Sequence, residues 1–298
     1  MCGIAGLFLK NRALEPELGA LYTPMLTAMT GRGPDSAGFA VYGDEVPEDW
    51  VKLTLQHADP DFPWEEIAEG LERDLDVPVK WFRNADVAVL KTGAGEAAVR
   101  SWLEDRQPGI EVMSVGRGIE ILKGVGLPGE IAERYGLARM QGSHVVGHTR
   151  MATESAVDLA GSHPFSTGRD LCLVHNGSLS NHNRLRDSLE RRGLSFATYN
   201  DSEVAAGYLT WRLAEGADLQ EALETALTDL DGFYTFTVGT RDGFAVLRDP
   251  IACKPAVLAE TGDYVAMASE YQALAHLPGI EAGEVWEPEP GRVYAWHR

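Results

Sequence analysis

The sequence predicts an α+β fold, in which strands and helices occupy different stretches of the chain. A short apolar run at residues 3–9 is typical of a buried strand, and strand-like runs fill residues 232–297. Three helical patterns lie between them, at about 180–193, 201–214 and 218–230. The 298 residues are enough for one large domain or two small ones with a substantial core.

The amino-terminal half alternates between the two kinds of element. Apolar residues at helical spacing predict a helix over 17–29, and a second apolar strand is expected over 38–42. Residues 44–143 are interpreted as an inserted α/β subdomain, because they have their own apolar periodicity. Its expected strands are 51–56, 86–91 and 111–115, and its expected helices lie near 64–74, 95–106 and 128–138.

The carboxy-terminal half continues with strands at 143–149 and 171–175, and Ser180 and Asp201 are the expected N-caps of two of the helices. The strand-like runs after residue 232 predict a meander, with a hairpin turn at 241–243.

The charge balance excludes several classes of partner. There are 45 Asp and Glu against 26 Lys and Arg, a net charge of −19. Such a chain is a poor candidate for binding nucleic acid or an anionic membrane surface, since both require clustered basic residues. No run approaches the ~20 apolar residues of a membrane span, and the amino terminus lacks the zones of a signal peptide.

The cysteines indicate a reducing compartment. Cys2, Cys172 and Cys253 are too few for a disulfide framework, so we expect the protein to be cytoplasmic. No C-x-x-C pair occurs, and His144 and His148 fall on an expected strand without helical metal-site geometry, so no metal site is expected.

Cys2 is the most informative residue for chemistry. Removal of Met1 would make it the first residue, with a free α-amino group whose ordinary pKa near 7.7–8.0 suits a general base. Thiol and amine on one residue form a nucleophile–base pair. Taken alone, Cys2 could equally be a small apolar residue that opens a strand.

Three later segments offer polar groups of complementary kinds. Arg150 ends an expected strand and could capture a carboxylate, with the Thr153 hydroxyl nearby, or form a surface ion pair. The side-chain amide of Asn176 and the backbone N–H of Gly177 could form an oxyanion hole or a simple Asn-Gly turn. Asp201 could bind an ammonium group or cap a helix.

Six motifs in this order resemble the class II glutamine amidotransferases, which are N-terminal nucleophile hydrolases with a four-layer αββα sandwich. They are Cys2-Gly3-Ile4-Ala5-Gly6, Arg32-Gly33-Pro34-Asp35-Ser36-Ala37-Gly38, Gly147-His148-Thr149-Arg150, Gly161-Ser162-His163-Pro164-Phe165, His175-Asn176-Gly177 and Asn200-Asp201-Ser202-Glu203. The resemblance implies one such domain over residues 2–298, with the insertion at about 44–143.

The resemblance also implies roles. Cys2 would attack the side-chain amide of glutamine, and Asn176 and Gly177 would hold the oxyanion. Arg150, assisted by Thr153, would bind the substrate carboxylate, and Asp201 its ammonium group. Arg32 would pack at the nucleophile and order the nearby loop.

The long insertion is similar to that of the glutamate-synthase-like branch, including stand-alone glutaminase subunits of the N-methylglutamate synthase type. The resemblance therefore implies a separate synthase subunit, containing flavin and iron–sulfur clusters, as the recipient of ammonia, and no cofactor on this chain. Two alternatives stay open: an independent γ-glutamyl amide hydrolase, and a non-catalytic glutamine-sensing or scaffold subunit.

Overall fold

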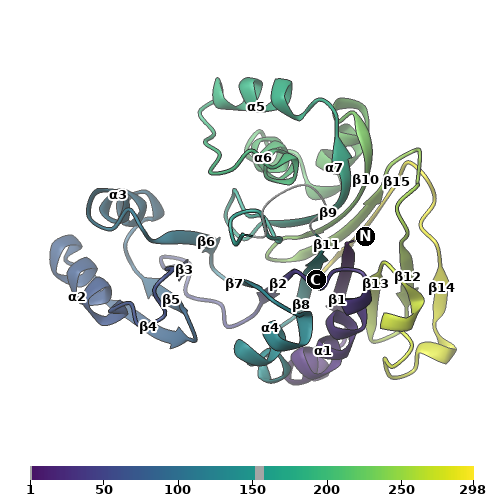
Figure 1. Ribbon diagram of the computed structural model, residues 1–298, viewed down its shortest axis with the longest axis horizontal. Helices are drawn as coiled ribbons and strands as arrows, with labels where there is room; N and C mark the ends of the chain where they lie inside the picture. The colour runs from purple at the N-terminus through teal and green to yellow at the C-terminus, as the bar shows by residue number, and fades with distance from the viewer. Residues whose placement is uncertain (1, 152–157) are drawn as a thin grey trace.

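Two β-sheets packed face to face form the centre of the molecule in the computed structural model, which describes residues 2–151 and 158–298. Helices cover the two outer faces (Figure 1). Met1 and Thr153 lie outside the described residues, so the expected role of Thr153 stays a prediction.

The larger sheet has seven strands, in the order β14-β12-β13-β1-β8-β2-β7. Its central strand β1 (Gly3–Leu9) is buried along its whole length and pairs antiparallel with β8 and β13. The other strands are β2 (Ser36–Tyr42), β7 (Ile119–Val125), β8 (His144–Arg150), β12 (Val257–Glu260), β13 (Tyr264–Ala268) and β14 (Glu284–Trp286).

The smaller sheet has four strands, in the order β15-β11-β10-β9. They are β9 (Cys172–Leu179), β10 (Gly232–Gly239), β11 (Gly243–Arg248) and β15 (Arg292–His297). Apolar side chains of both sheets fill the space between them, including Ile4, Phe8, Val174, Phe244 and Met267. The inward faces are apolar because each strand alternates its side chains between this layer and an outer one.

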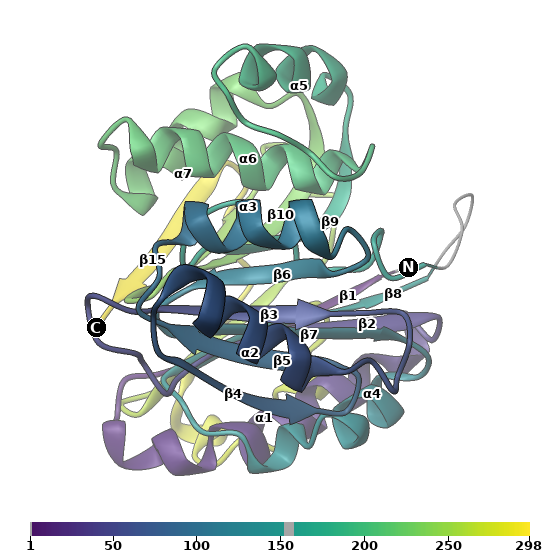
Figure 2. The same cartoon turned by 90° about the vertical axis from the view of Figure 1, so that its left-hand side faces the viewer.

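Helices complete the outer layers. Helices α1 (Leu18–Ala28) and α4 (Pro128–Arg134) pack on the seven-stranded sheet, and α6 (Asp201–Ala214) and α7 (Leu219–Asp229) pack on the four-stranded one. Helix α5 (His182–Glu190) packs on α6. Figure 2 shows α6 and α7 above the two sheets and α1 and α4 below them. The expected α+β fold with a four-layer αββα sandwich is confirmed.

A third sheet, in the order β4-β5-β3-β6, projects from the sandwich (left in Figure 1). It comprises β3 (Val51–Gln56), β4 (Val79–Asn84), β5 (Val87–Thr92) and β6 (Glu111–Gly116), with α2 (Trp64–Leu75) and α3 (Glu96–Arg106) packed on it. Within the expected insertion 44–143, β7 and α4 belong instead to the main sandwich. The boundary 44–143 itself stays a prediction.

The buried Lys52 joins the third sheet to the sandwich. Its ammonium group donates to the carbonyls of Gly43 and Gly118, at 2.8 and 3.0 Å, and pairs with the Glu120 carboxylate at 2.9 Å.

Two expectations from the sequence were wrong. The strands after residue 232 are not one meander: β10, β11 and β15 lie in the four-stranded sheet, whereas β12, β13 and β14 lie in the seven-stranded sheet.

The helix caps are also displaced by one residue. Helix α5 begins after Asn181 rather than Ser180, and α6 is capped by Asn200, whose side chain accepts from the Ser202 amide at 2.8 Å.

No helix among residues 2–151 and 158–298 is long and apolar enough to cross a membrane. In the same residues, no group of three or more His, Cys, Asp or Glu side chains is placed to hold a metal ion.

Candidate active site

Cys2 lies at the edge of a cavity of about 290 Å³ at one end of the two sheets. It directly precedes β1, beside the last residue of β8, because β1 and β8 run antiparallel with Gly3 opposite Thr149. Every predicted site residue that the structure describes lines this cavity: Cys2, Arg32, Arg150, Asn176, Gly177 and Asp201. The fold thus brings together residues that are up to two hundred positions apart in the sequence.

The Cys2 thiol is half-buried and lies against the backbone of Met151. The Met151 amide donates to Sγ at 3.4 Å, and Sγ lies 3.8 Å from the Met151 carbonyl oxygen. The Cys2 carbonyl accepts from Arg32 Nε at 3.0 Å and from Asn176 Nδ2 at 3.1 Å. The residue is therefore held through its backbone, while the thiol faces the cavity wall.

Arg32 contacts the backbone of Cys2 and the carboxylate of Glu270. Its Nη1 pairs with Glu270 Oε1 at 2.7 Å, and its side chain is 10% exposed. Glu270 follows β13, the neighbour of β1. The pair therefore fixes the Arg32 guanidinium and offsets its charge, which suits a role in positioning Cys2.

Asn176 and Gly177 belong to β9 and are not the central residues of a turn. They pair with Thr235 and Tyr234 of β10. Gly177 has φ +148°, and a Cβ at this position would lie 2.0 Å from the carbonyl oxygen of Phe233. Only glycine fits, and the turn interpretation is wrong.

Opposite charges face the same cavity from different elements. Arg150 ends β8, and Asp201 is the first residue of α6. Asp201 Oδ2 accepts from the Leu179 amide at 2.9 Å, so the carboxylate is tied to the end of β9, whereas the cap of α6 is Asn200. A fixed cation and a fixed anion in one cavity suit a zwitterionic ligand.

Three histidines at the cavity have no role in the sequence prediction. The ring of His148 stacks on that of His163, with centroids 4.1 Å apart, and His175 Nδ1 lies 2.9 Å from the Ser202 hydroxyl. Burial lowers the pKa of His148 to about 3 and also lowers the pKa values of His163 and His175. All three rings are therefore uncharged at neutral pH and poor proton acceptors.

The sequence analysis missed three further residues. Lys254 lines the cavity, Ser269 contacts Asn176, and Glu270 pairs with Arg32. His148, His163 and His175 could have been found, because each stands inside a quoted motif. The other three have no local signal: Ser269 and Glu270 reach the site only because β13 pairs with β1.

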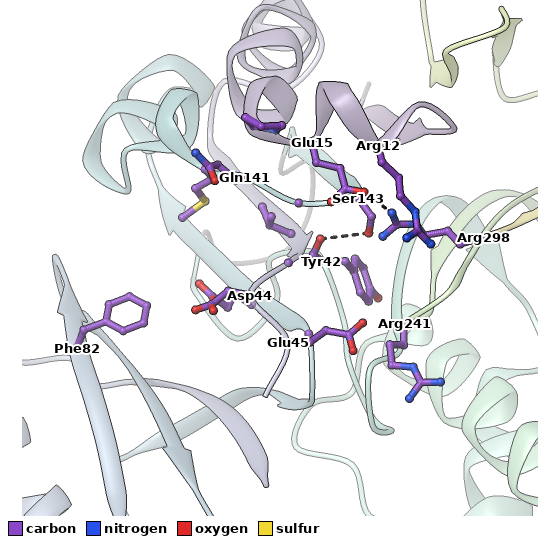
Figure 3. A pocket seen from close by; sticks show the side chains of 17 residues that line it. Arg12, Glu15, Tyr42, Asp44, Glu45, Phe82, Gln141, Ser143, Arg241 and Arg298 are labelled. Atoms are coloured by element: carbon purple, nitrogen blue, oxygen red, sulfur yellow. Dashed lines mark hydrogen bonds and ion pairs between the residues drawn. The ribbon is translucent and has the colours of Figure 1, made fainter. Parts of the chain in front are cut away.

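A larger cavity, of about 840 Å³, lies at the opposite end of β2 and β8 (Figure 3). It is lined by charged side chains, among them Arg12, Glu15, Asp44, Arg241 and Arg298. Its four acids are all paired: Glu15 with Arg298, Asp44 with Lys91, Glu45 with Arg117 and Glu120 with Lys52. It contains none of the predicted site residues, so the smaller cavity is the better candidate for chemistry.

Comparison with known proteins agrees with this geometry. The glutamine amidotransferase domain family matches residues 148–276. The glutamine amidotransferase-like protein GlxB of Rhizobium meliloti is 55% identical, over 99% of this chain and 98% of its own. A putative glutamine amidotransferase of Methanothermobacter thermautotrophicus is 34% identical, over 98% of both chains.

A solved structure shares the fold. The glutamine phosphoribosylpyrophosphate amidotransferase from B. subtilis superimposes with a TM-score of 0.63 at 20% identity. The match covers 99% of this chain and 47% of that one, so this chain corresponds to about half of the larger protein.

Proposed function

Because this chain belongs to the glutamine amidotransferase family, we propose that it hydrolyses glutamine to glutamate and ammonia through a thioester on Cys2. One observation carries the proposal. The Asn176 side-chain amide lies 3.1 Å from the Cys2 carbonyl, in the same cavity as Gly177, Arg150 and Asp201. These residues could thus supply a nucleophile, an oxyanion donor and two charges for a zwitterion in one cavity.

The first step uses Cys2 after removal of Met1. The thiol sulfur attacks the carboxamide carbon of glutamine, and the thiol proton passes to the α-amine of the same residue. The amine suits this task at neutral pH because its ordinary pKa is near 7.7–8.0. The low pKa values of the neighbouring histidines support this assignment, since neutral rings of such low basicity are poor bases.

The tetrahedral oxyanion would accept hydrogen bonds from Asn176 Nδ2 and the Gly177 N–H. Collapse of this intermediate breaks the carbon–nitrogen bond, and ammonia leaves with the proton held by the α-amine. Water then attacks the thioester, giving glutamate and the free thiol.

Arg150 would hold the substrate α-carboxylate and Asp201 its α-ammonium group. Thr153 would add a hydroxyl donor to the carboxylate. Arg32 would act on substrate indirectly, by fixing the backbone of Cys2.

We propose a separate synthase subunit as the recipient of ammonia, similar to glutamate synthase and containing flavin and iron–sulfur clusters, as in an N-methylglutamate synthase. Residues 44–143 and 201–298 carry most of the net charge of −19, so they would meet a basic partner face. Binding should then weaken as salt rises; a complex insensitive to salt contradicts this steering.

The three free thiols, Cys2, Cys172 and Cys253, support a reducing compartment, the cytoplasm, as the place of action.

The test combines intact-mass measurement with an assay of ammonia release. Active protein should lack Met1, and Cys2→Ala should abolish turnover. Cys253→Ala is the matched control, because Cys253 is exposed and does not line the cavity. Retention of Met1 on active protein, or ammonia release by Cys2→Ala, contradicts the mechanism.

The same assay separates the alternatives. Activity on glutamine that appears only with a co-purified partner supports the subunit proposal. Activity of the purified chain on γ-glutamyl amides rather than glutamine would indicate the independent hydrolase. Glutamine binding without turnover under either condition would indicate a sensing or scaffold subunit.

A further inference from the structure

We infer that His148 is a positioning residue that fixes the Asn176 amide with its nitrogen toward Cys2, so that the oxyanion hole exists before substrate arrives. This inference rests on the proposed function. It assigns a task to a buried histidine of the cavity for which the sequence predicted no role.

An asparagine amide has a donor end and an acceptor end, so its orientation decides what it can stabilise. Asn176 Nδ2 faces the nucleophile, donating to the Cys2 carbonyl at 3.1 Å and lying 3.3 Å from the Ser269 hydroxyl. Rotated by half a turn, the same side chain would present its carbonyl oxygen to an oxyanion. That orientation repels the charge it should stabilise.

His148 supplies the contact that distinguishes the two orientations. Its Nε2 lies 3.1 Å from Asn176 Oδ1, and both residues are almost fully buried. Since Oδ1 can only accept, Nε2 carries the proton and donates. His148 comes from β8 and Asn176 from β9, so this hydrogen bond joins the two sheets.

The rotated amide would lose its partner at Cys2. Its oxygen would face the Cys2 carbonyl, where two acceptors repel each other. Its NH₂ group could be accepted by His148 only if the ring proton moved from Nε2 to Nδ1. The observed orientation is therefore favoured as long as Nε2 carries the proton.

The His148 ring is itself held in place. It stacks on His163, and burial, together with the positive charge of the nearby Arg150, opposes its protonation. The ring therefore keeps the same neutral form throughout the usual assay range, and the hydrogen bond does not change with pH there.

The test uses three variants of the full chain. His148→Leu removes the donor, and His148→Gln restores a side-chain N–H of similar reach. His144→Leu is the matched control, because His144 is equally buried on the same strand but bonds to Thr240 at 2.8 Å, away from the cavity.

We expect His148→Leu to lower kcat about tenfold to a hundredfold with little change in KM, because only the oxyanion loses stabilisation. His148→Gln should recover most of the loss, and His144→Leu should keep wild-type kcat. The double variant His148→Leu/Asn176→Ala should be no slower than Asn176→Ala alone, because both changes disable the same group. Wild-type kcat in His148→Leu, or multiplied losses in the double variant, overturns the inference.

A second measurement does not depend on turnover. In NMR spectra the Asn176 side-chain NH₂ should be protected from exchange in wild type and in His148→Gln, and lose protection in His148→Leu. Equal protection in all three overturns the inference. If wild type released no ammonia, the proposed function would fail, while this measurement would still decide the position of Asn176.

Discussion

Asn176 and Gly177 are neighbours in β9 that would contribute different groups to the same task. Asn176 offers a side-chain amide, and Gly177 offers a main-chain N–H that the chain can present only with φ at +148°. The two residues should therefore respond differently to substitution by alanine.

Asn176→Ala should fold normally and lower kcat by about 10²–10³, with KM for glutamine nearly unchanged. The amide would act on the oxyanion and not on the substrate's charged groups, which Arg150 and Asp201 would bind. Steady-state kinetics measure this directly. Normal turnover would remove Asn176 from the oxyanion hole.

Gly177→Ala should lose both activity and stability. The added Cβ would lie 2.0 Å from the Phe233 carbonyl oxygen and 2.7 Å from Tyr234 Cα, so β9 would have to separate from β10. We expect a loss of at least about 2–3 kcal/mol in unfolding free energy, measured by urea denaturation. Gly193→Ala is the control, because its φ is also positive but its Cβ would meet no atom within 4 Å. Equal losses in both would show that backbone strain, not the approach to β10, sets the cost.

Single residues differ in how far the sequence could predict them. Cys2, Arg150 and Asp201 carry reactive or charged groups inside recognisable motifs. His148 stands in such a motif too, but its importance depends on a contact across two sheets. Ser269 is beyond local reasoning, since its hydroxyl accepts from the Ile4 amide at 2.9 Å and only tertiary pairing brings the two together.

Among the elements, β8 carries two histidines that the fold buries. His144 and His148 lie on it, and burial lowers the pKa of each to about 3. An unfolded chain takes up protons on these residues near pH 6.5, whereas the folded protein does not until the pH is much lower. Their contribution to stability is therefore present above pH 6.5 and is lost as pH falls.

The unfolding free energy should fall by up to about 1.4 kcal/mol per pH unit for each of these histidines between pH 6.5 and 3. In His144→Gln, the unfolding free energy should fall less steeply with pH, because one of the two titrating histidines is missing. Urea denaturation at pH 7.5, 6 and 5 gives both slopes. The same slope in wild type and variant would contradict the assignment to His144.

Most of the apolar strands were predicted, but β7 was missed although it is largely buried, and β4 and β14 were also missed. The sequence of β1 is apolar throughout, but β4 alternates between half-buried and exposed residues such as Lys80 and Trp81. The three residues of β14 are too few to show a period. The apolar runs of β12 and β13 correctly indicated strands, but no local property specifies which of two sheets a strand will join.

At the scale of the whole molecule, Lys52 is one of the links between the third sheet and the sandwich. Its side chain is fully buried and donates to the carbonyls of Gly43, which precedes β3 in the sequence, and Gly118, which follows β6.

Lys52→Met should lower the unfolding free energy by about 3–5 kcal/mol, because it leaves Glu120 without its cation and removes a donor from three backbone carbonyls. Lys91→Met is the control: Lys91 pairs with the exposed Asp44, and such pairs contribute about 0–1 kcal/mol. Urea denaturation of both variants gives the comparison. Similar losses in the two would show that the buried pair does not secure the junction.

The place of β1 in the middle of the larger sheet has a consequence for biosynthesis. Ala5 pairs on one side with Gly147 and on the other with Ala268, so this strand leaves the ribosome long before either neighbour exists. Pairing over such separations is slow, because the intervening chain must first be ordered. The surroundings of the Cys2 thiol are therefore complete only after Ser269 and Glu270 have been synthesised. A partly translated chain would carry the reactive group but not the activity.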